Sequence, residues 1–294
     1  GNMSIMDRAN DRARRRLMMP AWTQALTVLL PCGYSVAALL YAMAFAGESG
    51  PDVRRFRTPL MRGLLLLHSG LFALHGFAAD GFPTFDAWLS LSAVALALAL
   101  LFVAITWRFG HASVGALVIG SVALLQLLAS MFGPVAAIPA TAPGSGASGV
   151  HAITAAVASA ALILSGLYGF LYLVLLRQMK RKTFGAIFRQ LPDLTQLAKM
   201  TRRAALAGFL GLTLGVNVGI GLAHAEGTAG FEYTDPTVLL TLSLWVHFGL
   251  IAFSKRIRGL TAQRASLAAV AGLAVLVGTL LLFVVPGATF HAFG

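Results

Sequence analysis

Charged residues are scarce in this chain, and cysteine is almost absent. Asp, Glu, Lys and Arg make up 11% of the 294 residues, against about 25% in soluble proteins. So few charges exclude an ordinary water-soluble domain. With Cys32 as the single cysteine, the chain has no internal disulfide and no multi-cysteine metal site. What it does contain is apolar: 58% of the residues are hydrophobic, which indicates a membrane protein.

Acidic residues are scarcer than basic ones. The 10 Asp and Glu stand against 22 Lys and Arg, which gives a formal net charge of +12. In a soluble protein this balance would suggest nucleic acid as a partner. In a membrane protein, Lys and Arg instead mark the loops that stay in the cytoplasm. We therefore expect a lipid bilayer, and no nucleic acid, among the partners.

Long apolar runs occupy most of the sequence. A hydrocarbon core of about 30 Å needs about 20 residues of apolar helix. We therefore predict an all-α fold, a polytopic membrane helical bundle of about eight transmembrane helices, with a basic tail at 1–20 and a single transmembrane domain at 21–294. The predicted spans are about 22–46, 63–79, 88–106, 113–138, 151–176, 204–224, 237–253 and 265–285. The glycine-rich run "GFLGLTLGVNVGIG" follows no strand, so it favours helix packing over nucleotide binding.

The basic residues predict an orientation. Loops 47–62, 107–112, 177–203 and 254–264 hold 17 Lys and Arg, whereas 80–87, 139–150, 225–236 and 286–294 hold none. The positive-inside rule places the first set in the cytoplasm. We expect a multi-pass protein of the bacterial inner membrane with a periplasmic C-terminus.

The N-terminal tail disagrees with this orientation. It carries the other five arginines, Arg8, Arg12, Arg14, Arg15 and Arg16, and eight spans would leave it outside. Three explanations stay open: the tail contacts a partner or acidic headgroups, the first span is not a simple crossing, or translation begins near Met18 or Met19.

Seven histidines are distributed unevenly in depth, and each has an ordinary interpretation as a hydrogen-bonded helix residue. His151 begins the fifth predicted span, and His291 follows the eighth at the same outer face. Two such imidazoles can form an axial pair for haem iron. His75 lies toward the outer end of the second span, about 10 Å along one helix face from the deeper His68. Zinc is the less favoured metal, because the sequence has no His-x-x-x-His or His-Glu-x-x-His pattern.

Three further segments carry a specific pattern. In "GFEYTDPTVLLTLSLW", residues 230–245, an Asp235-Pro236 pair precedes Trp245 by ten residues; "GVHAITAAVASAALILSGLYGFLYLVLL" opens with His151, and "VVPGATFHAFG" contains His291. With the loop and helix of "LPDLTQLAKMTRRAALAGFLGLTLGVNVGIGLAH", they resemble the cytochrome c assembly protein family, whose members carry or present haem at the outer membrane face. The resemblance runs from about residue 63 to the end. It implies haem as cofactor and His151 and His291 as its iron ligands.

The chain departs from the family in its outer loop. The family pattern is of the type WGxxWxWDPKETW, but here Phe231 and Tyr233 are the aromatics nearest before the Asp, and Thr237 replaces the Lys. Stacking of haem on Phe231, Tyr233 and Trp245 would bury less apolar area than tryptophans provide. The pattern is closest to the eight-span HemX-like branch, in which this loop is degenerate. Asp235 and Pro236 also suit the start of a helix whether or not haem binds.

Three functions are compatible with these patterns. The first is a haem-binding membrane protein that resembles cytochrome c biogenesis proteins and performs no turnover with its own side chains. The second is a non-catalytic subunit or assembly factor of a larger membrane complex that kept the fold and lost haem. The third and least favoured is a transporter, because the sequence lacks paired intramembrane carboxylates and a clear repeat of broken helices.

Overall fold

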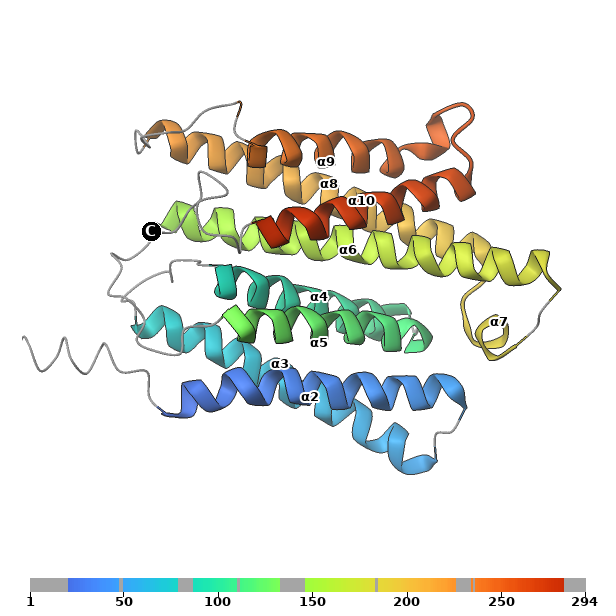
Figure 1. Ribbon diagram of the computed structural model, residues 1–294, viewed down its shortest axis with the longest axis horizontal. Helices are drawn as coiled ribbons and strands as arrows, with labels where there is room; N and C mark the ends of the chain where they lie inside the picture. The colour runs from blue at the N-terminus through green and yellow to red at the C-terminus, as the bar shows by residue number, and fades with distance from the viewer. Residues whose placement is uncertain are drawn as a thin grey trace, which may run out of the picture.

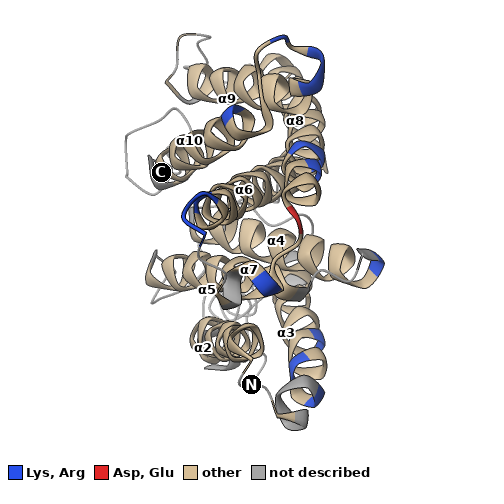
Figure 2. Cartoon of the chain, turned by 90° about the vertical axis from the view of Figure 1, so that its right-hand side faces the viewer, with Lys and Arg blue, Asp and Glu red and all other residues tan. Residues whose placement is uncertain are grey.

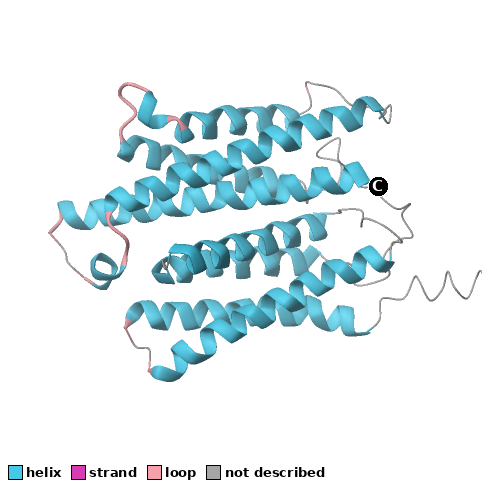
Figure 3. Cartoon of the chain, turned by 180° about the vertical axis from the view of Figure 1, so that it is seen from behind, coloured by secondary structure: helices cyan, strands magenta, loops and turns pink. Residues whose placement is uncertain are grey.

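The computed structural model of the chain describes residues 21–47, 50–78, 87–109, 112–132, 146–182, 185–225, 234 and 236–282. Within these ranges all regular structure is helical and no β-strand occurs, as Figure 3 shows. The all-α prediction is confirmed. The tail at 1–20 lies outside the described residues.

Eight long helices coincide with the eight predicted spans. They are α2 (Ala21–Ala46), α3 (Pro51–Ala78), α4 (Ala87–Phe109), α5 (Gly115–Phe132), α6 (Gly146–Lys180), α8 (Leu194–Ala225), α9 (Pro236–Ala252) and α10 (Ala262–Leu282). Short elements connect them: η1 (Ala112–Val114), α7 (Ala186–Gln190) and η2 (Ser254–Arg256). Among the described residues, α2, α4, α6, α8 and α10 are long and apolar enough to cross a membrane, and α5 and α9 are shorter apolar helices.

Two helices begin well before their predicted spans. α3 starts at Pro51 instead of residue 63, and α8 starts at Leu194 instead of residue 204. Both extensions contain basic residues, which an apolar window rejects. Arg and Lys are nevertheless good helix formers, so each helix continues into the polar boundary of the membrane. A multi-pass membrane bundle accounts for both the apolar spans and these basic ends.

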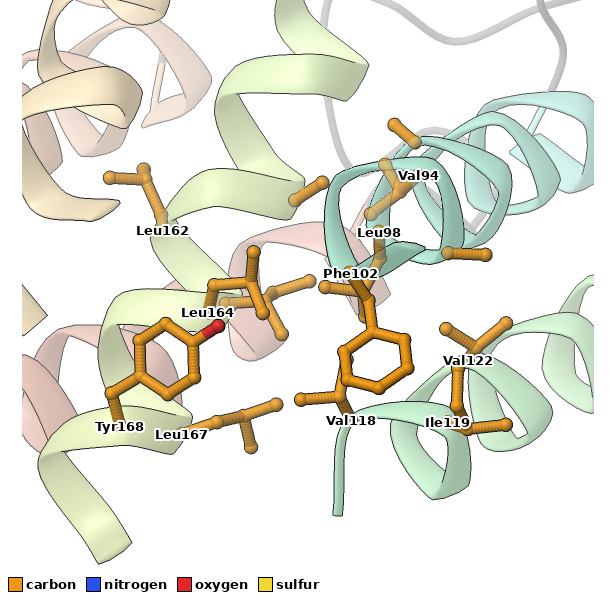
Figure 4. Packing of buried hydrophobic residues seen from close by; sticks show 14 of the residues in the cluster. Val94, Leu98, Phe102, Val118, Ile119, Val122, Leu162, Leu164, Leu167 and Tyr168 are labelled. Carbon is orange, nitrogen blue, oxygen red and sulfur yellow. The ribbon is translucent and has the colours of Figure 1, made fainter. Parts of the chain in front are cut away.

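The helices form two groups of four, which lie one above the other in Figure 1. The N-terminal group is α2 to α5, and the C-terminal group is α6, α8, α9 and α10. Contact between α4 and α6 joins the two groups. Figure 4 shows this junction, where Leu98 and Phe102 of α4 lie near Leu164 and Leu167 of α6. All four side chains are buried.

The basic connections gather at one end of the bundle. The turns between α2 and α3, α4 and α5, α6 and α8, and α9 and α10 all lie at the right-hand end of Figure 1, and Figure 2 views that end with its Lys and Arg in blue. The predicted grouping of the basic loops is therefore confirmed. The first residues of α6 lie at the opposite end.

A row of glycines brings α6 and α8 together, in the most extensive helix contact of the described structure. The helices run antiparallel, so residue numbers fall along α6 as they rise along α8. The neighbours that a methyl group would meet are Leu162 at Gly208, Ala158 at Gly211, Thr154 at Gly215 and His151 at Gly219. In lipid, where apolar surfaces gain little by leaving the solvent, such close backbone approach is what holds helices together.

We predict that adding one methyl group has opposite effects on stability at Gly211, which belongs to the row, and at Gly120, which lies outside it. At Gly211 it would lie 2.9 Å from Cβ and 3.2 Å from Cα of Ala158, atoms that cannot rotate away. Gly211→Ala should therefore lower the free energy of unfolding by about 1–3 kcal/mol. At Gly120 of α5 nothing lies within 4 Å, so Gly120→Ala should raise it by up to about 1 kcal/mol.

Unfolding in a denaturing-detergent titration measures both variants. Equal effects of the two substitutions would contradict the close α6–α8 contact.

Candidate functional site

His151 lies on the outermost rung of the glycine row, one turn inside the start of α6. Its ring is half-buried and rests over Gly219 of α8, and its Nδ1 is 2.9 Å from the carbonyl oxygen of Gly215. The first turns of α6, which include His151, lie at the end of the bundle opposite to the basic loops. Both contacts come from α8, so the position of the imidazole depends on the α6–α8 register.

The carbonyl of Gly215 fixes the tautomer of His151. A carbonyl oxygen only accepts hydrogen bonds, so Nδ1 must carry the proton and donate it. Nε2 then keeps its lone pair, and it has no hydrogen-bond partner among the described residues. A ring that donates one N–H to a backbone carbonyl and presents the other nitrogen is the arrangement that metal-binding histidines use.

Trp245, the second predicted site residue in the described part, lies in the middle of α9. Its Nε1–H donates to Thr213 Oγ1 at 2.8 Å, and its ring stacks on Phe209 with centroids 5.1 Å apart and planes at 26°. One face of the indole is thus occupied by Phe209. Neither partner on α8 was predicted from the sequence.

α8 separates the contacts of these two residues. His151 contacts α8 at Gly215 and Gly219, whereas Trp245 contacts it at Phe209 and Thr213. At 3.6 residues per turn and 1.5 Å per residue, these positions lie about a third of a turn apart around the helix, and Thr213 lies about 9 Å deeper than Gly219. Both residues pack on the same helix but on different faces, and a role for Trp245 against haem stays a prediction.

The other predicted site residues fall largely outside the description. His291, Phe231 and Tyr233 lie outside the described residues, as does Asp235. His75 belongs to α3, but its side chain is not described. Pro236 is the first residue of α9, as its fixed backbone angle predicts for a helix start.

His68 differs from His151 in having both ring nitrogens engaged. Its Nδ1 lies 3.1 Å from the Tyr34 hydroxyl and its Nε2 lies 2.9 Å from Ser92 Oγ, which in turn donates to Gln126 Oε1 at 3.0 Å. Because Ser92 gives its proton to an amide oxygen, it must accept one from Nε2–H, and Nδ1 accepts from Tyr34. The polar chain therefore joins α2, α3, α4 and α5, and none of its four side chains is more than 1% exposed.

This polar chain excludes His68 from the candidate site, because the ring has no lone pair left for a metal. Sequence reasoning located His68 in the deeper part of a span but missed its partners. Ser92 and Gln126 lie 24 and 34 residues from the residues they contact, so no helical spacing links them. An apolar run that contains a Gln is the one available signal, since a buried amide in lipid needs a partner.

His247 also donates to a carbonyl: its Nε2 lies 2.8 Å from the Ala268 oxygen on α10. His224, at the end of α8, places Nδ1 2.8 Å from Ile220 O in its own helix. Among the described residues, no group of three or more His, Cys, Asp and Glu could hold a metal ion. The described residues therefore do not support a site in which protein side chains alone hold a metal ion. A cofactor that contains its own metal needs fewer ligands from the protein.

Comparison with known protein families gives a match. The family model described as "Cytochrome C assembly protein" matches residues 59–289, from the first turns of α3 to beyond α10. No curated protein matches the chain. The matched region includes His75, His151, Phe231, Tyr233 and Trp245, and it ends two residues before His291.

The polar chain predicts that Ser92→Ala is more harmful than its size suggests. The substitution leaves His68 Nε2–H and Gln126 Oε1 buried without partners, and it should lower the free energy of unfolding by about 1–3 kcal/mol. The matched control is Ser121→Ala in α5, because Ser121 donates only to Leu117 O of its own helix. Detergent unfolding that shows the same small loss for both serines would refute the coupled chain.

Proposed function

The chain belongs to the cytochrome c assembly protein family, and we propose that it binds haem at the end of the bundle opposite to the basic loops. The proposed iron ligands are His151 and His291. The HemX-like branch is the proposed place of this chain within the family, because its outer loop lacks the tryptophans before Asp235. The protein would hold or pass on haem and would not turn over a substrate.

The hydrogen bond between His151 Nδ1 and Gly215 O is the observation that carries this proposal. The Nδ1–H donates to Gly215 O at 2.9 Å, which leaves Nε2 as the nitrogen available to a metal. Haem iron is commonly held by neutral imidazole, and a hydrogen bond from the second nitrogen raises the basicity of the ligand. The residues present therefore fit an axial ligand. When bound, haem would supply an iron that the imidazoles of His151 and His291 would hold.

Other residues would shape the haem site without ligating the iron. Phe231 and Tyr233 precede α9, and Trp245 is fixed within α9 by Thr213 and Phe209. Aromatic rings gain stabilisation by stacking on a flat conjugated ligand. His75, at the outer end of α3, is proposed as a further contact.

The membrane side follows from the basic loops. Their location at one end of the bundle, together with the positive-inside rule, favours that end in the cytoplasm. We propose a bacterial inner membrane location, with the C-terminus and the haem site on the periplasmic side. Partners from a cytochrome c assembly complex would then meet haem on that side.

A second function is favoured by one observation. The tryptophans that precede the Asp in the family pattern are absent here, so most of the expected stacking area is lost. A protein that kept the bundle but no longer binds haem would serve as a stabilising subunit of a membrane complex. The same experiment separates the two functions.

The proposal predicts a haem spectrum that depends on His151. The protein, purified in mild detergent and supplied with haem, should show a Soret band that shifts on reduction. His151→Ala should weaken or remove the band, and added imidazole should restore part of it by filling the vacated ligand position. His151→Ala combined with His291→Ala should abolish it.

His224→Ala is the matched control, because His224 is another imidazole near the end of α8, and its Nδ1 bonds to Ile220 O of its own helix. Its spectrum should equal that of the wild type. A colourless protein that takes up no added haem and co-purifies with other membrane subunits would support the second function instead.

A further inference from the structure

We propose that Gly219 is a positioning residue for His151: its missing side chain lets the imidazole lie on α8, bound to Gly215 O, with Nε2 open to a ligand. This inference rests on the proposed function for the identity of the ligand. It does not rest on it for the geometry of the ring.

The first step is steric. A methyl group at Gly219 would lie 2.8 Å from Cε1 of His151, 3.1 Å from Nδ1 and 3.6 Å from Nε2. Cε1 is the ring carbon between the two nitrogens, so the methyl group would press on the ring between its hydrogen bond and its open nitrogen. The ring is flat and rigid, and relief requires rotation of the whole side chain away from α8.

The second step is the hydrogen bond. Nδ1 reaches Gly215 O across the helix interface at 2.9 Å only while the ring rests on Gly219, one turn farther along α8. Rotation away from Gly219 breaks this bond and removes the reason for the proton to stay on Nδ1. The ring would then sample both tautomers, and Nε2 would no longer be a fixed donor.

Gly219 differs from the other glycines of the row. The inner glycines of the row face apolar or small side chains, namely Leu162, Ala158 and Thr154. There the absence of a side chain serves only close packing. At Gly219 it also leaves space beside a nitrogen with a free lone pair, so one residue serves both packing and the candidate site.

The control is built into the same helix. Gly221 lies two residues beyond Gly219, and nothing lies within 4 Å of the position its Cβ would take. Gly221→Ala therefore makes the same chemical change with the same effect on helix propensity, but without contact to His151.

The first experiment needs no haem. Protein labelled with ¹⁵N-histidine and prepared without haem should show, by NMR, a His151 signal of the Nδ1–H tautomer, assigned by its loss in His151→Ala. Gly219→Ala should lose that signal or convert it to a tautomer mixture, whereas Gly221→Ala should keep it. An unchanged tautomer in Gly219→Ala would overturn the proposal.

The second experiment titrates haem into the same proteins. Disturbing a partner behind a metal ligand costs about 10- to 100-fold in affinity, and we expect this loss in Gly219→Ala and less than about twofold in Gly221→Ala. The wild type could bind no haem while Gly219→Ala still changes the tautomer of His151. That pair of results would uphold the positioning role and refute the proposed function. Haem binding that Gly219→Ala leaves unchanged would uphold the proposed function and refute the positioning role.

Failure of Gly219→Ala to fold is covered by a double variant. If the methyl group clashes with the imidazole, removal of the ring relieves the clash, and Gly219→Ala with His151→Ala should be as stable as His151→Ala alone. A double variant as unstable as Gly219→Ala would place the damage elsewhere and overturn the proposal.

Discussion

The close approach of α6 and α8 is the contact on which the rest of the C-terminal group depends. Lipid offers little gain for burying one apolar side chain against another, so helices associate where small residues allow dense packing. The row from Gly208 to Gly219 provides this along about three turns, against a single face of α6. The contact fixes the register, and the register sets where the imidazole of His151 lies.

The remaining faces of α8 and α6 receive the other helices. Phe209 and Thr213, on a different face of α8, hold Trp245 of α9, and Gly249 of α9 in turn leaves room for Phe209. α10 packs on α6 where Gly166 and Gly169 allow it. Glycine therefore decides helix contacts on three sides of the C-terminal group, and the α6–α8 and α8–α9 contacts leave an imidazole and an aromatic ring in defined places.

The N-terminal group is held together differently. Its buried polar chain from Tyr34 to Gln126 satisfies every ring nitrogen of His68 and spans all four helices. Buried polar groups in a membrane are costly unless paired, so a complete chain specifies one arrangement of these helices. The contrast with His151 is chemical: two imidazoles of one chain differ in whether a nitrogen is left to bind a ligand.

Much of the architecture is predictable from composition and periodicity, whereas the contacts are not. The length of the apolar runs predicted the eight helices, because a helix that spans lipid must be apolar. The distribution of Arg and Lys predicted the basic end, because charged side chains stay in water. The spacing of Gly208, Gly211, Gly215 and Gly219 indicates a packing face but not its partner. The tautomer of His151 depends on a carbonyl 64 residues away, and the hydrogen-bond partners of Trp245 and His68 lie 24 to 34 residues away in sequence. No local pattern encodes such pairs, and the fold alone brings them together.

The α6–α8 register can be measured directly by disulfide formation. With Cys32 replaced by serine, cysteines at Thr154 and Gly215 should cross-link on mild oxidation in native membranes, since the Cβ position of Gly215 lies 3.5 Å from Thr154 Oγ1. Trypsin then cuts the basic connection between α6 and α8, and the account predicts that the two fragments stay joined until a reductant is added. Fragments that separate without reductant, or that join instead through cysteines at the exposed Val157 and Leu210, would contradict it.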